Sequence, residues 1–521
     1  MSKIQKTSDL FTNKELTDNS QLLRKSSIER FGDDLTELIV SYLSISDKIR
    51  LECLSKQIQA LIFNRQKCLR ISHVKSGDNL EEMISKTSRY HSVDCRALGS
   101  VLKKFKNLDT IRIEGRMTVD SELIETIAEN ANHLKNLWIN VRFISDITTE
   151  CLKSLGQKCG STLQSLKFDG LTEKQMRQLL SLTPELRSIT VDNIKSVVSD
   201  AKPSRCRTPD DAKEEKKPFL PKLQEIQFCR CNSRTLNQFQ IEYKDQIQKV
   251  ITHLLSFDLM SDNMTRALTG FGYFRRLRVL DLFIDVVDTS HVKSIDNGLK
   301  QLAEKLKDLQ QLTFTLDGNL LQNNNLFSVF SSFKSLSSLE ISITADQDFE
   351  ADFEDNPIYN YGSIRDLRHL SQLKHLSLTL EQLSDDCLMG IDRYLPQLLS
   401  IRLNSSKAIT DKSLQQLSQM KRLSKLEVIC YTAEEDQNIT DSGVRQLIDC
   451  CPRLQSLTFD QKNSSFDFDI TEESIESIVK RAERFPKIQF IFSFAVYKNE
   501  KSVQLFNRLN NLPQNLTIEI M

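Results

Sequence analysis

Apolar residues recur along most of the chain in one fixed pattern. An apolar residue is followed, three and five positions later, by two more that flank a single residue, usually polar. The alternation at the end of the pattern predicts a short strand with one buried face. The pattern returns about every 29 residues, which indicates an internal repeat. It begins at Leu108, Leu134, Leu163, Leu186, Leu223, Leu254, Leu277, Leu309, Leu336, Leu373, Leu398, Leu423, Leu454 and Phe485.

A second pattern, with helical period, fills the segments between these strands. In the segment 439–451 the apolar residues are spaced three, four or five positions apart and share one helix face. Similar spacing follows Val119, Ile147, Leu171, Leu383, Ile409 and Ile470. Hydroxyl and acidic residues stand where these helices should begin, and they can cap the first N–H groups. These pairs are Ser384-Asp385, Thr410-Asp411, Thr440-Asp441 and Thr471-Glu472.

One strand and one helix cannot enclose a core, so the repeats must stack. Stacked strands form a curved parallel sheet, and the helices then cover its outer face. The sequence therefore predicts an α/β solenoid. Repeat lengths are irregular between about 195 and 372, so the boundaries there stay open. The charged segments 201–218 and 345–362 are expected to be loop insertions, although one of them could instead fold over the strand-lined face or carry a regulatory modification.

Composition excludes several classes of function. Lys and Arg together number 70, as do Asp and Glu, so there is no basic excess of the kind that nucleic-acid binding requires. No apolar run approaches the roughly 18 residues of a membrane span, and the polar N-terminus lacks a signal peptide. We therefore expect a cytoplasmic or nuclear protein that binds neither nucleic acid nor membrane.

The sequence also lacks the motifs of common enzymes and metal sites. It contains no CxxC pair and no GxxxxGK, HExxH or GxSxG motif. Cys159, Cys450 and Cys451 fall at the ends of predicted repeat helices, where a small buried side chain fits. We therefore expect a non-catalytic protein with no cofactor and no metal.

A short helical segment precedes the repeats. Residues 1–27 are polar and are expected to be disordered, whereas 28–66 carries apolar residues at helical spacing. A segment of this length cannot bury so many apolar groups by itself, so it must pack on the repeats, on a partner or on both. One face of its first helix is lined by Leu35, Leu38, Ile39 and Leu43, and a second helix, which Ser46 or Asp47 can cap, carries Leu51 and Leu54.

The repeats resemble the cysteine-containing leucine-rich repeat family over about residues 67–521. The clearest unit is NITDSGVRQLIDCCPRLQSLTF, from Asn438 to Phe459. The preceding segment resembles the F-box, whose acid, Leu, Ile and Leu positions are matched by Asp34, Leu35, Ile39 and Leu43. Asp47 matches the acid that opens the second F-box helix, and Leu51 and Leu54 match its apolar positions. The sequence departs from the F-box at Gly32, Ser55 and Ile58, where the family has proline, cysteine and tryptophan.

An F-box followed directly by such repeats is the layout of the F-box/LRR family. The resemblance implies the substrate-recognition subunit of an SCF-type (cullin-RING) ubiquitin ligase. Its F-box would dock a Skp-family adaptor, and through it a cullin, while the repeats bind a protein substrate for ubiquitin-dependent degradation. The adaptor contacts that the resemblance implies are Leu35, Leu38, Ile39, Leu43, Asp47, Leu51 and Leu54. In the alternative interpretation the N-terminal helices only cap the solenoid. The protein would then be a scaffold, unrelated to ubiquitin, that binds a protein partner on its concave face.

The strand residues between the buried positions are the candidates for target binding. They point to the strand-lined, concave face because side chains alternate along a strand. Trp138, the only tryptophan, should be exposed there between Arg112 and Lys167, and such a composition is typical of binding hot spots. Alternatively, Trp138 packs against a neighbouring side chain and binds nothing. The middle strands turn acidic at Asp258, Asp281 and Glu340, with Val279 and Phe283 beside them.

Overall fold

The computed structural model describes seventeen stretches of the chain in two compact units. Unit 1 comprises Met1–Asp192 and Phe219–Leu223, and unit 2 comprises Asn193–Pro218 and Gln224–Met521. The predicted tail 1–27, the insertion 345–362 and all but the last residue of the insertion 201–218 lie outside the described residues. The described residues are 38, 43, 45–51, 56–72, 84–87, 90–199, 218–231, 233–255, 261–285, 291–317, 326–344, 363–380, 383–405, 409–430, 439–461, 472–494 and 512–520.

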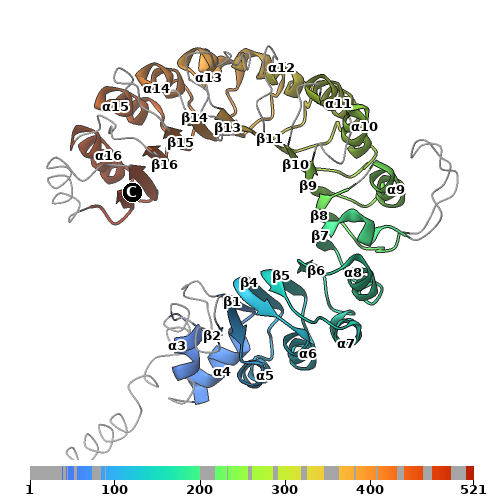
Figure 1. Ribbon diagram of the computed structural model, residues 1–521. Helices are drawn as coiled ribbons and strands as arrows, with labels where there is room; N and C mark the ends of the chain where they lie inside the picture. Colours follow the sequence, from blue (N-terminus) through green and yellow to red (C-terminus); the bar gives the residue numbers. More distant parts are fainter. Residues whose placement is uncertain are drawn as a thin grey trace, which may run out of the picture. The chain divides into compact units, whose positions relative to one another are not determined.

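Unit 1 is a row of parallel strands with helices on one face (Figure 1). Strands β1, β4, β5, β6 and β7 pair in that order, and the antiparallel pair β2–β3 joins β4. The strands are β1 (Cys68–Ser72), β2 (Ile84–Thr87), β3 (Tyr90–Val93), β4 (Thr110–Val119), β5 (Asn136–Ile144), β6 (Ser165–Phe168) and β7 (Ser188–Asn193). The helices are α3 (Ile45–Arg50), α4 (Lys56–Arg65), α5 (Cys95–Lys104), α6 (Ser121–Asn130), α7 (Thr149–Cys159) and α8 (Glu173–Leu180).

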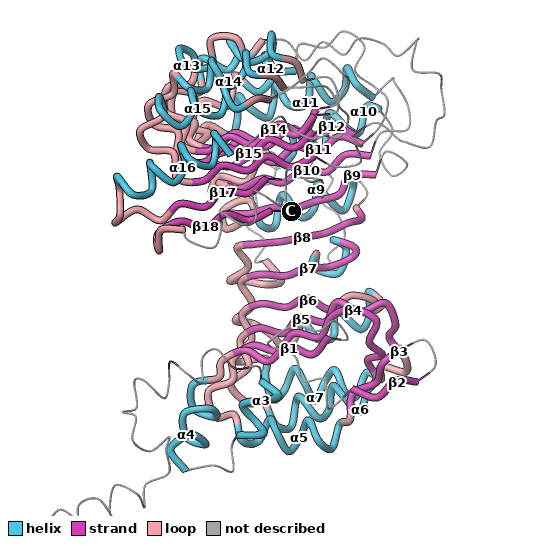
Figure 2. The backbone as a smooth tube through the Cα atoms, turned by 90° about the vertical axis from the view of Figure 1, so that its left-hand side faces the viewer, coloured by secondary structure: helices cyan, strands magenta, loops and turns pink. Residues whose placement is uncertain are grey.

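Unit 2 continues the same architecture, with eleven described strands that pair in parallel from β8 to β18 (Figure 2). The strands are β8 (Glu225–Arg230), β9 (Lys249–Leu255), β10 (Val279–Asp285), β11 (Gln311–Asp317), β12 (Ser338–Thr344), β13 (His375–Leu380), β14 (Ser400–Ser405), β15 (Lys425–Cys430), β16 (Ser456–Gln461), β17 (Phe490–Phe494) and β18 (Leu516–Ile520). The helical elements are η3 (Ile194–Val197), α9 (Ser233–Tyr243), α10 (Ser261–Phe271), α11 (His291–Lys305), α12 (Leu326–Phe330), η6 (Ile364–His369), η7 (Asp385–Leu388), α13 (Ile391–Tyr394), α14 (Asp411–Ser418), α15 (Asp441–Cys450) and α16 (Glu472–Arg484).

The repeat pattern builds the core as predicted. In β15 the two pattern residues Leu426 and Val428 are fully buried, and they lie beside Leu457 and Phe459 of β16. Each repeat thus places its apolar residues beside those of the next, while the intervening residue stays on the opposite face. The chain is an α/β solenoid of leucine-rich repeat type.

The predicted strand that starts from Leu254 is wrong. The strand in that region is β9, and its buried positions are Val250 and Thr252. Thr252 is a polar residue, only 1% exposed, in the third position of the pattern, so the apolar motif was hidden there. Asp258, predicted on this strand, lies outside the described residues.

The last repeat is also shifted from its predicted place. Phe485, predicted as the first buried residue, is 36% exposed, whereas Phe490, predicted as the third, is buried as expected. Strand β17 begins at Phe490 and also buries Phe492. Two strands of the stack, β1 and β18, were not predicted because each stands at an end of the repeat array, where the full pattern is not repeated.

Two of the four predicted helix caps are present. Thr410 and Thr440 each accept a hydrogen bond from an N–H in the first turn of α14 and α15. Ser384 makes no side-chain cap, and its segment forms only the short elements η7 and α13 around Gly390, whose φ is +79°. Thr471 lies outside the described residues.

Two of the three cysteines predicted for the core are buried there. The Cys159 and Cys451 thiols donate to the carbonyls of Ala131 (3.5 Å) and Leu417 (3.4 Å) in the preceding repeat. Burial raises the pKa of Cys159 to about 11 and that of Cys451 to about 12, so both thiols stay protonated at neutral pH. Cys450 is half-buried, so that prediction is wrong for it.

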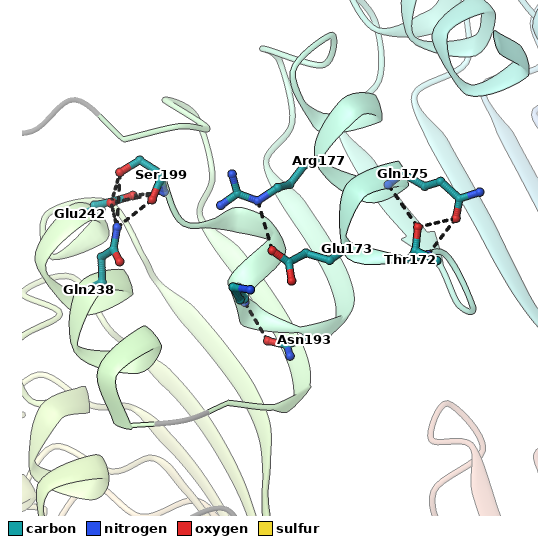
Figure 3. Close-up of polar contacts among 9 residues, drawn as sticks. Thr172, Glu173, Gln175, Arg177, Asn193, Ser199, Gln238 and Glu242 are labelled. Atoms are coloured by element: carbon teal, nitrogen blue, oxygen red, sulfur yellow. Dashed lines mark hydrogen bonds and ion pairs between the residues drawn. The ribbon is translucent and has the colours of Figure 1, made fainter. Parts of the chain in front are cut away.

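A buried carboxylate holds the first segment of unit 2 against α9 (Figure 3). Glu242 is 5% exposed and accepts the Ser199 N–H at 3.0 Å, the Ser199 hydroxyl and the Gln238 side-chain N–H at 3.0 Å. The neighbouring Tyr243 hydroxyl donates to the Val197 carbonyl at 2.7 Å. These bonds fix residues 197–199 on the helix.

We expect Glu242→Ala to lower the free energy of unfolding by about 1–3 kcal/mol, since it removes the acceptor of the half-buried donors of Ser199 and of one Gln238 N–H. Asp245→Ala is the matched control, because Asp245 pairs with Arg275 at 3.2 Å on the surface. Its loss should be below about 1 kcal/mol. Urea unfolding followed by circular dichroism measures both. Equal losses for the two variants would contradict a special role for Glu242.

Candidate functional site

The helical segment before the repeats carries four described residues of the predicted adaptor surface. Leu38 is 52% exposed, whereas Leu43 and Leu51 are half-buried. Asp47 lies in α3, and its carboxylate is 3.5 Å from the Arg50 guanidinium. The other predicted contacts, which lie outside the described residues, are Leu35, Ile39 and Leu54.

Helix α4 is attached to the first repeat helix through its last turns. Ile62 and Phe63 are buried, and the Phe63 ring centroid lies 5.2 Å from that of Phe105, just beyond α5. The Asn107 side chain also donates to the Asn64 carbonyl at 2.7 Å. The opposite end of the helix begins at the exposed Lys56. The described part of the segment is therefore anchored to the repeats at one end and keeps exposed surface further toward the N-terminus.

The strand-lined face of unit 1 brings the three predicted residues together. Arg112, Trp138 and Lys167 are register partners on β4, β5 and β6. The Arg112 guanidinium carbon lies 4.1 Å from the centroid of the Trp138 ring, a cation–π contact. The indole N–H of Trp138 donates to the Ser165 hydroxyl at 3.3 Å. Trp138 is half-buried rather than exposed, because Arg112 covers its ring.

The charges on this face are unevenly paired. Arg70, beside Arg112 on β1, forms an ion pair with Glu114 at 2.7 Å. Lys167 lies 3.8 Å from Asp169, whose pKa is raised by burial and lowered in part by Lys167. Across the described residues, no carboxylate lies within ion-pair distance of Arg112, and its buried Nε has no hydrogen-bond partner. The central cation of the row is therefore the uncompensated one.

The strand-lined face of unit 2 carries Asp281 and Phe283 on β10. The Phe283 ring stacks on His253 of β9 with centroids 4.1 Å apart. The pKa of Asp281 is raised, first by burial and then by the neighbouring Glu340, while His253 and Lys249 oppose the shift. This face is a second candidate surface, described separately because it belongs to the other unit.

Three residues of these surfaces were not predicted from the sequence, namely Arg70, Glu114 and His253. Arg70 stands between Leu69 and Ile71, and that alternation was the available signal for β1. Glu114 follows the last pattern residue of β4. His253 was missed because the β9 register was wrong.

Of the comparisons with known proteins, only the one with solved structures found matches. No family model matches the sequence, and no curated protein matches it either. Among the solved structures that match is the crystal structure of the Rad7 and Elc1 complex in yeast. That match has 11% sequence identity and a TM-score of 0.35, and it covers 99% of this chain and 98% of that chain. Because the backbones agree only loosely, the fold assignment depends on the strand and helix order described above.

The described part of the chain was compared with the requirements of a membrane span and of a metal site. None of its helices has both the length and the apolar composition needed to cross a bilayer. Its His, Cys, Asp and Glu side chains form no group of three or more that could hold a metal ion.

Proposed function

We propose that this protein is the substrate receptor of an SCF-type ubiquitin ligase. The observation that carries the proposal is Leu38, which is 52% exposed on the segment before the repeats while the end of α4 is packed on α5. A leucine exposed on a helix is suited to docking in an apolar groove. In this proposal Leu35, Leu38, Ile39 and Leu43 contact a Skp-family adaptor, which links the chain to a cullin.

The repeats would hold the protein target, and the chain itself would perform no chemistry. A receptor of this kind works by raising the effective concentration of a target lysine near the ubiquitin-loaded enzyme. The strand-lined face of each unit suits that task, because stacked repeats present an extended surface to a protein partner. The expected location is the cytoplasm or the nucleus.

The alternative is a scaffold unrelated to ubiquitin, and the packing of Phe63 on Phe105 favours it. That contact is what a solenoid cap would make. The two functions differ in what the segment around Leu38 binds.

Affinity purification of the tagged full-length chain from cells distinguishes them. We expect wild type to recover a Skp-family adaptor and a cullin. Leu38→Asp, alone or with Ile39→Asp, should reduce their recovery at least about tenfold, because burying a leucine contributes about 1.5–3 kcal/mol.

Met389→Asp is the matched control, since Met389 is 61% exposed on unit 2. It introduces the same charge at an exposed apolar residue and should leave adaptor recovery unchanged. Wild type that recovers neither adaptor nor cullin would favour the scaffold instead. A Leu38→Asp variant that recovers both normally would overturn the assignment of the docking surface to Leu38.

A further inference from the structure

We propose that the strand-lined face of unit 1 recognises an acidic segment of the target protein, and that a carboxylate of that segment pairs with the Arg112 guanidinium above Trp138. This inference depends on the proposed function only in calling the bound protein a degradation target. The binding itself needs no adaptor.

The first argument is the charge balance of the row that crosses β1, β4, β5 and β6. Its outer cations, Arg70 and Lys167, each have a carboxylate on the same face, at 2.7 Å and 3.8 Å. Among the described residues, Arg112, between them, has a cation–π contact with the indole of Trp138 and no carboxylate within ion-pair distance. A guanidinium that is partly desolvated has lost hydrogen bonds to water, and without an anion nothing replaces them. The carboxylate of an incoming segment would supply the missing acceptors and the opposite charge.

The second argument is that Arg112 is already held in place. Its guanidinium lies over the Trp138 ring, and the Ser165 hydroxyl in turn accepts the indole N–H. The contact with the ring does not use the N–H groups of a guanidinium as hydrogen-bond donors. Although Nε is buried, the two terminal nitrogens can still pair with both oxygens of a carboxylate. Little side-chain entropy is then lost on binding, which favours affinity.

The third argument concerns selectivity. A basic segment that crosses this row would be repelled by Arg70, Arg112 and Lys167, because Glu114 and Asp169 are already engaged with two of these cations. A third carboxylate of the face, Asp192, lies near Asp169 and away from Arg112. Of the two neighbouring rows, the one with Thr110 and Asn136 is neutral and internally bonded, since the Asn136 side chain donates to the Thr110 hydroxyl at 2.9 Å. The other row carries Glu114 and Asp169, the carboxylates engaged with Arg70 and Lys167. The discrimination should weaken as salt rises.

Selection from a displayed random peptide library on the immobilised full-length chain tests the proposal. We expect peptides enriched in Asp and Glu with wild type, and at least about a fivefold loss of that enrichment with Arg112→Gln. Arg402→Gln is the matched control, because Arg402 occupies the same strand position in unit 2 but pairs with Glu427 at 3.4 Å. It should leave the enrichment intact.

The most enriched peptide is then titrated against the purified chain while the fluorescence of Trp138 is recorded. As the only tryptophan, Trp138 reports on this face alone. We expect a saturable change that is lost in Arg112→Gln and reduced in Arg112→Lys, which keeps the charge but not the planar fork.

Several results would overturn the proposal: no enrichment of acidic residues, enrichment that survives Arg112→Gln, or a bound peptide that leaves Trp138 fluorescence unchanged. A phosphoserine peptide that binds through Arg112 when its glutamate counterpart does not would overturn the carboxylate assignment. Failure of the proposed function can be told apart from failure of this inference, because adaptor binding and peptide binding are measured separately. Arg112→Gln should recover the Skp-family adaptor normally, whatever the peptide result.

Discussion

Gly160→Ala is expected to lower the free energy of unfolding of unit 1 by about 3 kcal/mol or more. Gly160 caps the C-terminal end of α7, where the next repeat passes very close. A Cβ added there would overlap the backbone carbonyl of Leu182, and a backbone atom cannot rotate away as a side chain can. The two repeats would have to separate, and overpacking of a tight core commonly costs 1–3 kcal/mol or occasionally more.

Gly99→Ala is the matched control, because Gly99 lies inside α5 and its added Cβ would sit 3.4 Å from Thr126, an ordinary contact. This variant should be neutral or gain up to about 1 kcal/mol through helix propensity. Urea unfolding followed by Trp138 fluorescence reports on unit 1 for both variants. A Gly160→Ala protein as stable as Gly99→Ala would show that the repeats can shift apart at little cost.

The repeat architecture could be predicted because the same apolar pattern recurs in many successive repeats. A single apolar pattern is weak, but strand and helix periods that agree from unit to unit leave few other folds. The prediction failed where one residue broke the pattern without breaking the structure. Thr252 is a polar residue that is buried at a pattern position usually taken by an apolar residue. Phe485 is an apolar residue that matches the pattern but is exposed. One sequence gives no means of telling such exceptions from the rule.

The candidate site was predictable only in part, and for a similar reason. Strand alternation placed Arg112, Trp138 and Lys167 on one face, and the structure confirms that they are neighbours. Alternation cannot say which cation is paired. Arg70 is paired by Glu114 of the adjacent strand, which order in the sequence does not show, whereas Asp169 stands only two residues after Lys167.

The acidic residues at the helix starts of unit 2 have a role beyond capping. Asp411 accepts the Thr440 N–H at 2.9 Å and the Thr440 hydroxyl at 2.6 Å, both from the next repeat. The same hydroxyl accepts the Ser442 N–H at the start of α15. Asp385 accepts the same pair of bonds from Thr410, so the arrangement repeats along the array. Each helix start is thereby tied to the next by charge-assisted hydrogen bonds.

Asp411→Ala should therefore lower the free energy of unfolding of unit 2 by about 2–4 kcal/mol, because it leaves both Thr440 donors without their acceptor. Hydrogen exchange should become faster in the first turn of α15, since its cap has lost the group that orients it. In a solenoid that loss is confined to one interface between repeats, so β10 and β11 should keep their protection. Hydrogen exchange read by mass spectrometry measures both effects.

Asp386→Ala provides the comparison, since Asp386 lies in the first turn of η7 but is exposed. Removing it should cost below about 1 kcal/mol, the ordinary value of an exposed charge at a helix start. Asp411→Asn keeps one oxygen acceptor and should fall between the two. If the two alanine variants, Asp411→Ala and Asp386→Ala, show the same hydrogen exchange in the first turn of α15, the bonds to Thr440 do not couple the repeats. The stability of the array then comes from its apolar strand positions alone.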